Sequence, residues 1–489
     1  MLAVVFYLAC VGLALTLSLL GPIFVGLLVG EIDVVQRLGV YFLLGGFIFG
    51  GPVLSIMGRL RRVPHIGRLV LLLLVWMVMP IMAAIPFENI IGMRFIDALF
   101  ESVSGLTTTG SSILNTINEW PQAMIFWRAQ LQWYGGFLAL LSVILVLAPL
   151  GIGGITKPHD SMTVGADLKS TDGRLVAFIT NLALLYTTMT ALCFLGFFIT
   201  GTRAFYAMTL AMTATSTGGF LPFDGSVDDV LGVGGMFVFG LFLLLGATSI
   251  FWQRMVMAGK KDVLVRHRES YSVIALIALL TIGFIYVAIS ISAGTEKGAL
   301  SMVVEAFFNG ASLVSTSGVE TRPGYFTLMP LVIVLFVILI GGSAFSTSGG
   351  LKHYRLGGML VKSWGELDNL VYPNVVRQSH FGSERYDIQL MKAIWSLFVV
   401  AIITICLGTI FIATTGIPFE AALTATVSNF ATAGPVYYSG WAAPGTVAWP
   451  PYSAFSDQAK YALMILMLLG RLEVLAVIGL FSIRYWRSR

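Results

Sequence analysis

Four short segments that combine hydroxyl residues with glycine recur along this chain of 489 residues. They end in Gly110, Gly218, Gly318 and Gly434, and the intervals between these glycines are 108, 100 and 116 residues. Glycine allows backbone angles that other residues avoid, and rings of backbone carbonyls replace the hydration shell of the ion in the filters of cation channels. Four such segments around one axis would therefore present backbone carbonyls to a permeating cation.

A short, partly apolar stretch precedes each of these segments and is too short to cross a membrane. Alignment on the glycines places Ala98, Ala306 and Ala422 at one shared position and Ser104, Ser312 and Ser428 at another. A half-helix that ends at a filter would aim its negative C-terminal end at the cation. A single Thr-Thr-Gly in a membrane loop is more often a turn or a helix contact, but four copies in register predict a repeated pore element.

The composition shows where such elements must lie. Of all residues, 57% are hydrophobic and 11% are charged, whereas soluble domains carry roughly 25% charged residues. This excludes a soluble globular protein, a disordered chain and a disulfide-stapled domain. Runs of roughly 20 apolar residues are needed to cross the hydrocarbon layer as a helix. Ten are found, at about 3–20, 37–57, 69–87, 125–150, 176–200, 233–252, 271–293, 327–350, 389–414 and 458–483.

The predicted fold is an all-α integral membrane protein with ten transmembrane helices and four re-entrant pore half-helices. Four pseudo-symmetric repeats, each a span, a pore loop and a second span, would surround one pore. The expected units are two leading helices at 1–68 and pore repeats at 69–160, 161–268, 269–372 and 373–489.

Charge sets the orientation of these spans. Most of the Lys and Arg residues fall in alternate connections and in the C-terminal tail, and the positive-inside rule places that side, with both termini, in the cytoplasm. The net charge of +5 therefore reflects membrane orientation and does not imply nucleic-acid binding. Acidic residues such as Asp97, Glu101, Asp224 and Glu320 fall in outer segments, where they would either attract cations or form ordinary solvated loops.

Two further features interrupt the apolar spans. Residues 341–350 hold four glycines and four hydroxyl residues where the helix should continue, and glycine costs about 1 kcal/mol per position in a helix. The helix should unwind there, although a close-packed helix interface is an alternative. Arg471 lies within the last span, where a charge indicates function by default; a structural ion pair is the alternative, and Glu473 would face elsewhere.

Together these segments resemble the Trk/Ktr/HKT superfamily of potassium transporters, and specifically its bacterial TrkH branch, over nearly the whole chain. Supporting motifs are Gln132-Trp133-Tyr134-Gly135-Gly136, the glycines at 151–154, the run from Ile340 to Lys352, and Gly470-Arg471-Leu472-Glu473. The two leading spans match TrkH and are absent from the shorter KtrB type.

The resemblance implies roles for individual residues. The filter would comprise Thr108, Thr109, Gly110, Ser216, Thr217, Gly218, Thr316, Ser317, Gly318, Thr432, Ala433 and Gly434, with K⁺ bound by their carbonyls. The intramembrane gating loop would comprise Gly341, Gly342, Ser343, Ser346, Thr347, Ser348, Gly349 and Gly350, with Arg471 beside it. Ala433 departs from the hydroxyl pattern, and Glu320 stands close after the third filter segment.

The same resemblance implies K⁺ uptake across a bacterial inner membrane by a homodimer that works with a cytoplasmic ring of nucleotide-binding TrkA-type subunits. K⁺ would be the transported ion, and the chain would bind no cofactor. A secondary transporter of another cation, Na⁺-permeable or H⁺-coupled, is the alternative, but it predicts inverted halves. An intramembrane enzyme is the third class, and the sequence shows no convergent nucleophiles or metal ligands.

Overall fold

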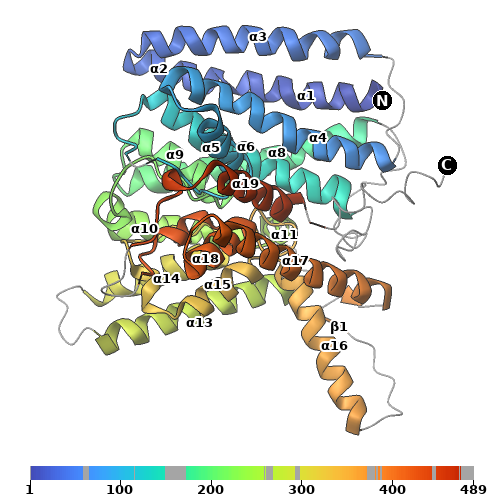
Figure 1. The fold of residues 1–489 in the computed structure, drawn as a ribbon, viewed down its shortest axis with the longest axis vertical. Helices are drawn as coiled ribbons and strands as arrows, with labels where there is room; N and C mark the ends of the chain where they lie inside the picture. The colour runs from blue at the N-terminus through green and yellow to red at the C-terminus, as the bar shows by residue number, and fades with distance from the viewer. Residues whose placement is uncertain are drawn as a thin grey trace.

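The computed structural model describes residues 2–58, 65–114, 116–148, 172–257, 259, 268–291, 298–371, 380–381, 384–385, 388–442, 448–472 and 474. Within this part the protein is a bundle of helices. Most of the long helices run side by side along one direction, whereas the helix at His353–Val371 projects away from the bundle (Figure 1). A two-stranded sheet, β1 (His380–Phe381) paired with β2 (Glu384–Arg385), is the only strand pairing described. The all-α prediction is confirmed.

Three helices lead the chain. α1 (Leu2–Ser18) and α2 (Leu20–Val29) together make one apolar segment long enough to cross a membrane, and α3 (Ile32–Ile56) makes the next. α2 ends at Gly30, whose left-handed backbone (φ 85°) stops the helix. α3 packs against α1 and stands at the edge of the bundle (Figure 1).

After these helices a long helix, a short buried helix and a further helix follow one another four times. The first two groups are α4 (His65–Pro86), η1 (Phe87–Ile91), α5 (Phe95–Leu106), α6 (Gln122–Ser142) and η2 (Val143–Leu147), then α8 (Asp172–Ile199), α9 (Ala204–Ser216), α10 (Val227–Ala247) and α11 (Ile250–Met257).

The remaining groups differ in their last helices. They are α13 (Arg268–Ile291), α14 (Ala299–Val314), η4 (Tyr325–Leu328), α15 (Leu331–Ile340) and α16 (His353–Val371), then α17 (Ile388–Thr414), α18 (Phe419–Phe430), η5 (Gly434–Tyr438), η6 (Tyr452–Ala454) and α19 (Asp457–Leu472).

The short helices α5, α9, α14 and α18 have 12 to 16 residues. At a rise of about 1.5 Å per residue they cannot span a hydrocarbon layer of about 30 Å. They are surrounded by the long helices, and their last turns are buried. Short buried helices therefore stand where the re-entrant half-helices are expected, and their role as pore helices stays a prediction.

Eight helical segments in the described part are long and apolar enough to cross a membrane, against the ten predicted spans. Within the predicted span at 327–350, the helix is interrupted at the glycine-rich stretch, as the sequence predicts. α15 has only 10 residues and ends at Gly341, whose φ of 67° is incompatible with a right-handed helix. The predicted span at 458–483 begins as α19, but most of its second half lies outside the described residues.

Candidate functional site

Each short helix ends on the same unusual backbone conformation. Four threonines just beyond the helix ends have left-handed angles: Thr108 (φ 55°), Thr217 (φ 52°), Thr316 (φ 60°) and Thr432 (φ 57°). A positive φ is an outlier for a β-branched residue, and strain of about 1–3 kcal/mol persists only where the surroundings impose it. All four threonines are completely buried. The fourfold repeat is therefore a repeat of backbone geometry as well as of sequence.

Backbone hydrogen bonds fix how the four segments correspond. The amide after each left-handed threonine donates to the carbonyl five residues earlier, in the pairs Thr109–Ser104, Gly218–Thr213, Ser317–Ser312 and Ala433–Ser428. Gly218 therefore takes the place of Thr109, and Gly219 takes the place of Gly110. The alignment that paired Gly218 with the other three glycines is off by one residue in the second repeat.

The corrected register also restores the matches that the second repeat lacked. Counted back from Gly219, Ala207 takes the place of Ala98, and Thr213 takes the place of Ser104. Ala207 and Ala98 are both completely buried, as are their counterparts Ala306 and Ala422. A small residue at one position and a hydroxyl residue at the other thus occur in all four repeats, and this pattern in the sequence could have identified Gly219.

The four segments contact one another in a closed ring. Each segment touches the next, and the last touches the first, through the pairs Gly110–Gly219, Gly218–Ser317, Gly318–Ala433 and Thr109–Gly434. The Ser317 hydroxyl donates to the Gly218 carbonyl (2.5 Å), and the Gly434 amide donates to the Thr109 carbonyl (2.8 Å). The predicted filter residues from distant parts of the chain are therefore brought together.

Gly110 shows why this ring requires glycine. Its φ is 77°, and a Cβ added there would lie 2.5 Å from the Cα of Gly219. Gly318 has a φ of 70°, and its added Cβ would lie 3.0 Å from the Ala433 carbonyl oxygen. Side chains at these two positions would strain their own backbone and push against the neighbouring segment.

The motif from Gln132 to Gly136 on α6 packs against two of these segments. A Cβ on Gly135 would collide with the Leu106 carbonyl at the end of α5, and one on Gly136 would lie 3.0 Å from the Cα of Ser216. The Gln132 carboxamide accepts a hydrogen bond from Phe220 N at 3.3 Å, just after Gly219. α6 thus forms a close support between the first and second segments.

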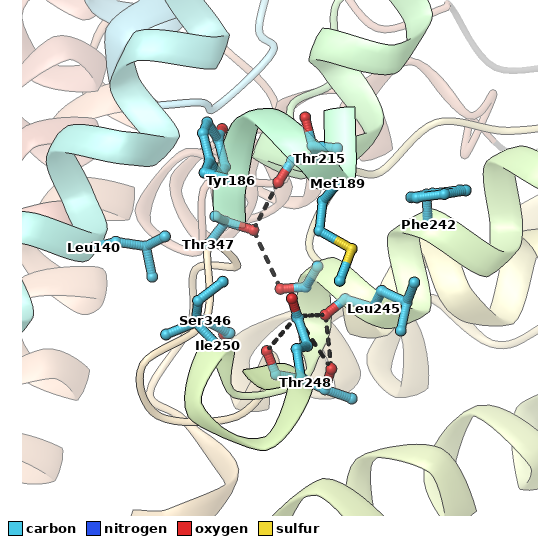
Figure 2. Close-up of a pocket in the computed structure, with 12 residues that line it drawn as sticks. Leu140, Tyr186, Met189, Thr215, Phe242, Leu245, Thr248, Ile250, Ser346 and Thr347 are labelled. Atoms are coloured by element: carbon cyan, nitrogen blue, oxygen red, sulfur yellow. Dashed lines mark hydrogen bonds between the residues drawn. The ribbon is translucent and has the colours of Figure 1, made fainter. Parts of the chain in front are cut away.

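The glycine-rich loop at 341–350 lies next to the four repeated segments, at the ends of their short helices. The Gly349 amide donates to the Thr316 hydroxyl (2.6 Å), and an added Cβ on Gly349 would collide with the Ala431 carbonyl. The Thr347 hydroxyl donates to the Thr215 carbonyl (3.2 Å) and the Gly246 carbonyl (3.1 Å). Thr215 belongs to α9 and Gly246 to α10, and Figure 2 shows Thr347 beside Thr215. The loop therefore contacts the second, third and fourth segments.

Arg471 of α19 connects this loop to the remaining, first segment. The guanidinium is buried, and it donates from Nε to the Thr107 carbonyl (2.7 Å) and from Nη1 to the Ser348 carbonyl (3.1 Å). Nη2 donates to the Thr108 hydroxyl. All these acceptors are neutral oxygens, and no ion pair of Arg471 occurs in the described part of the chain. Glu473 and the glycines at 151–154 lie outside the described residues.

The ends of the loop are fixed at the start of α13 and α16. Gly341 and Gly350 both have positive φ (67° and 74°) and lie so close that an added Cβ on Gly350 would be 2.9 Å from the Gly341 Cα. The buried Glu269 carboxylate accepts from the amides of Ala344 (2.5 Å) and Tyr354 (3.2 Å). No motif in the sequence indicates this role for Glu269.

A pocket lies beside the loop (Figure 2). Ser346 and Thr347 form one wall, and the facing walls come from α6, α8, α9, α10 and α11. The facing residues include Leu140, Met189 and Phe242. The loop is therefore bordered by packed helix ends on one side and by a mostly apolar pocket on the other.

Two predicted outer carboxylates are held by hydrogen bonds within the protein. Glu101 is completely buried and pairs with Arg128. Glu320, half-buried after the third segment, accepts from the amides of Gly324 (2.8 Å) and Phe326 (3.0 Å). Burial raises the pKa of the Glu320 carboxyl above its usual range. For Glu101, the alternative of an ordinary solvated loop is wrong.

Comparison with known proteins decides the family. Residues 87–251 and 326–487 match the sequence profile of TrkH, described as a cation transport protein. This chain belongs to the TrkH family. With the eight apolar helices, that membership makes it a multi-pass membrane protein of a non-enzymatic transporter family, as the sequence predicted.

Individual relatives of TrkH type cover most of the chain. The Trk system potassium uptake protein TrkH of Salmonella typhimurium is 28% identical over 86% of this chain and 85% of its own length. The TrkH protein of Vibrio parahaemolyticus is 26% identical over 98% of each chain. The crystal structure of the potassium transporter TrkH from Vibrio parahaemolyticus matches with a TM-score of 0.84 at 24% identity, over 99% of each chain. That structural match supports the predicted fold.

Proposed function

We propose that this chain takes up K⁺ across a bacterial inner membrane through one pore lined by its four repeated segments. The observation that carries the proposal is the closed ring of four buried segments, each with a left-handed threonine at the end of a half-helix. Non-helical backbone persists at membrane depth only where protein buries it or where it lines a water-filled path. The printed names of the relatives, potassium uptake proteins of the Trk system, support K⁺ as the ion.

In this proposal the carbonyls of the threonines and of the two following residues coordinate the dehydrated ion. The filter is formed by Thr108, Thr109, Gly110, Thr217, Gly218, Gly219, Thr316, Ser317, Gly318, Thr432, Ala433 and Gly434. Ser216 lies one position before it. The half-helices α5, α9, α14 and α18 contribute negative C-terminal ends that stabilise a cation.

The loop from Gly341 to Gly350 is the gate of this pore. It contacts three filter segments directly and the fourth through Arg471. A fixed positive charge beside a narrow path of low dielectric repels cations with little screening. Opening the pore requires the loop to leave the filter ends. Release of the loop would be controlled from the cytoplasm by nucleotide-binding subunits of the TrkA type, acting on a homodimer of this chain.

The test is ion flux into proteoliposomes that contain the purified full-length chain. We expect K⁺ to enter faster than Na⁺ under equal gradients, with no dependence on an imposed pH gradient. Flux of K⁺ that follows the pH gradient would support the alternative of an H⁺-coupled secondary transporter. Equal entry of Na⁺ and K⁺ would overturn the assignment of K⁺ as the preferred ion.

A further inference from the structure

A buried ion pair lies beside the first two filter segments. Glu101 on α5 and Arg128 on α6 have relative exposures of 0% and 2%, and Arg128 Nε lies 2.5 Å from Glu101 Oε1. Removing two charges from water costs several kcal/mol per ion, and apolar residues of the same volume often stabilise a fold as well or better. Stability alone is therefore a weak reason for this pair.

The contacts of Glu101 lie on the outer end of the first segment. Its carboxylate accepts a hydrogen bond from the Ser112 hydroxyl (3.2 Å) and another from the Ile113 amide (3.3 Å), two and three residues after Gly110. Because α5 also leads into Thr108, Glu101 holds both sides of the same filter segment. Glu101 thus lies on the helix before the segment and binds the residues after it.

The contacts of Arg128 lie on the outer end of the second segment. Its guanidinium lies over the Phe220 ring at 3.5 Å from the centroid, and Nη1 donates to the Leu221 carbonyl (3.2 Å). Phe220 and Leu221 follow Gly219 directly. Arg128 and Gln132 are four residues apart on α6 and thus share one helix face, and both contact this segment.

The other repeats have no such link at the equivalent position. Nine residues before their filter glycines stand Leu210, Asn309 and Ala425. The Asn309 amide donates to the Thr321 hydroxyl (2.8 Å), which lies within its own repeat. Of the four positions, only that of Glu101 carries a charge, and its partner reaches across to the next repeat.

We propose that the Glu101–Arg128 pair is a positioning element that fixes the outer ends of the first and second filter segments relative to each other and thereby sets ion preference. The proposal rests on the function proposed above. The pair has no net charge, so its effect on the ion is through the spacing of the Gly110–Gly219 contact. A selective site requires support of its coordinating groups by locked neighbours.

The variant that isolates positioning is Arg128→Lys. Lysine keeps the positive charge next to Glu101 but lacks the planar fork that reaches Leu221 and stacks on Phe220. The matched control is Lys460→Arg. Lys460 is equally buried and binds Asp97 of the same helix α5 at 2.7 Å, and its hydrogen bonds among the described residues go to Asp97 and to the Ser453 carbonyl, not to the residues that follow Gly110 or Gly219.

The measurement is the ratio of K⁺ to Na⁺ flux in proteoliposomes, with the yield and melting temperature of each purified variant. We expect Arg128→Lys to lower the ratio by about tenfold and Lys460→Arg to leave it at the wild-type value. A folded Arg128→Lys variant with the wild-type ratio would overturn the proposal. So would an equal fall in both variants, because this would indicate a general effect of disturbing α5.

Two additions keep the outcome clear. If Arg128→Lys does not fold, the double variant Glu101→Gln/Arg128→Met takes its place, because it removes both charges together and avoids an unpaired buried ion. A lowered ratio of K⁺ to Na⁺ flux in this variant supports the proposal. A wild-type ratio overturns the proposal. Failure of the proposed function looks different, because the wild-type protein itself would then show no preference for K⁺.

Discussion

The filter ring and the glycine-rich loop touch each other but are held in different ways. Every filter segment follows a buried half-helix and repeats the same amide-to-carbonyl bond across five residues. In the part of the chain that the structure describes, such a loop occurs in the third repeat only, and it depends on hydroxyl groups, on Arg471 and on Glu269. A typical hydrogen bond contributes only about 0.5–1.5 kcal/mol net. We therefore expect ion preference to reside in the ring and mobility in the loop.

The largest change in ion preference is expected when a side chain is added to a glycine of the ring. We expect Gly110→Ser to lower the ratio of K⁺ to Na⁺ flux by about thirtyfold, because positive-φ strain of about 2 kcal/mol adds to a collision with the Gly219 backbone. Ion competition in proteoliposomes measures the effect. Unchanged competition in a correctly folded variant would refute the placement of Gly110 in the filter.

The next comparison tests the register of the second segment. Gly219→Ser should lower the flux ratio by about tenfold, since an added Cβ would lie 2.8 Å from the Ser317 carbonyl. Gly218→Ser should change the ratio by less than about twofold. The residues that correspond to Gly218 in the first and third segments, Thr109 and Ser317, carry side chains. A Cβ added to Gly218 would meet only side-chain atoms of Gln132 within the nearest contacts. Ion competition in proteoliposomes measures both variants. A larger effect of Gly218→Ser than of Gly219→Ser would contradict the register in which Gly219 takes the place of Gly110.

Changes in the loop should leave ion preference intact. Arg471→Ala, or a deletion within 343–348, should raise K⁺ flux severalfold at an unchanged ratio of K⁺ to Na⁺, because the barrier to cations is removed. Membrane yield serves as the control for folding. Normal yield with wild-type or lower flux in both variants would show that the loop and Arg471 are not the gate.

The smallest effect concerns the outer mouth. Burial raises the pKa of Glu320, so its negative charge is lost on acidification at a higher pH than for an ordinary carboxyl. Apparent K⁺ affinity should fall by about twofold as the pH drops through this raised pKa. Glu320→Gln should show the lower affinity at every pH. A wild-type affinity that stays constant between neutral and acidic pH would exclude Glu320 as a source of attraction.

Much of the ring and the loop could be predicted from the sequence, because short apolar stretches and clustered glycines have local causes. The loop was predicted from the cost of Gly341 and Gly350 in a helix, and α15 does end there. The alignment of the second repeat is ambiguous in the sequence because Gly218 and Gly219 are adjacent and either can be matched to the other three glycines. Ala207 and Thr213 would have resolved the choice.

The links between distant helices could not be predicted in this way. Glu101 and Arg128 lie 27 residues apart on different helices, and no periodicity connects them. Glu269 and Ala344 are separated by 75 residues, and nothing near Glu269 in the sequence indicates a loop to hold. Such pairs depend on how the helices pack, which local patterns do not determine.

The shared hydrogen bonds of Arg471 have a thermodynamic consequence. The same guanidinium binds Thr107 at the base of the first repeated segment and Ser348 in the loop. In the proposed gating, departure of the loop would therefore change the environment of the proposed filter. Two equilibria that share a group are linked, and linkage is reciprocal. If opening alters the affinity of the filter for K⁺ by some factor, K⁺ occupancy alters the opening equilibrium by the same factor. External K⁺ would then act as an allosteric effector of its own gate.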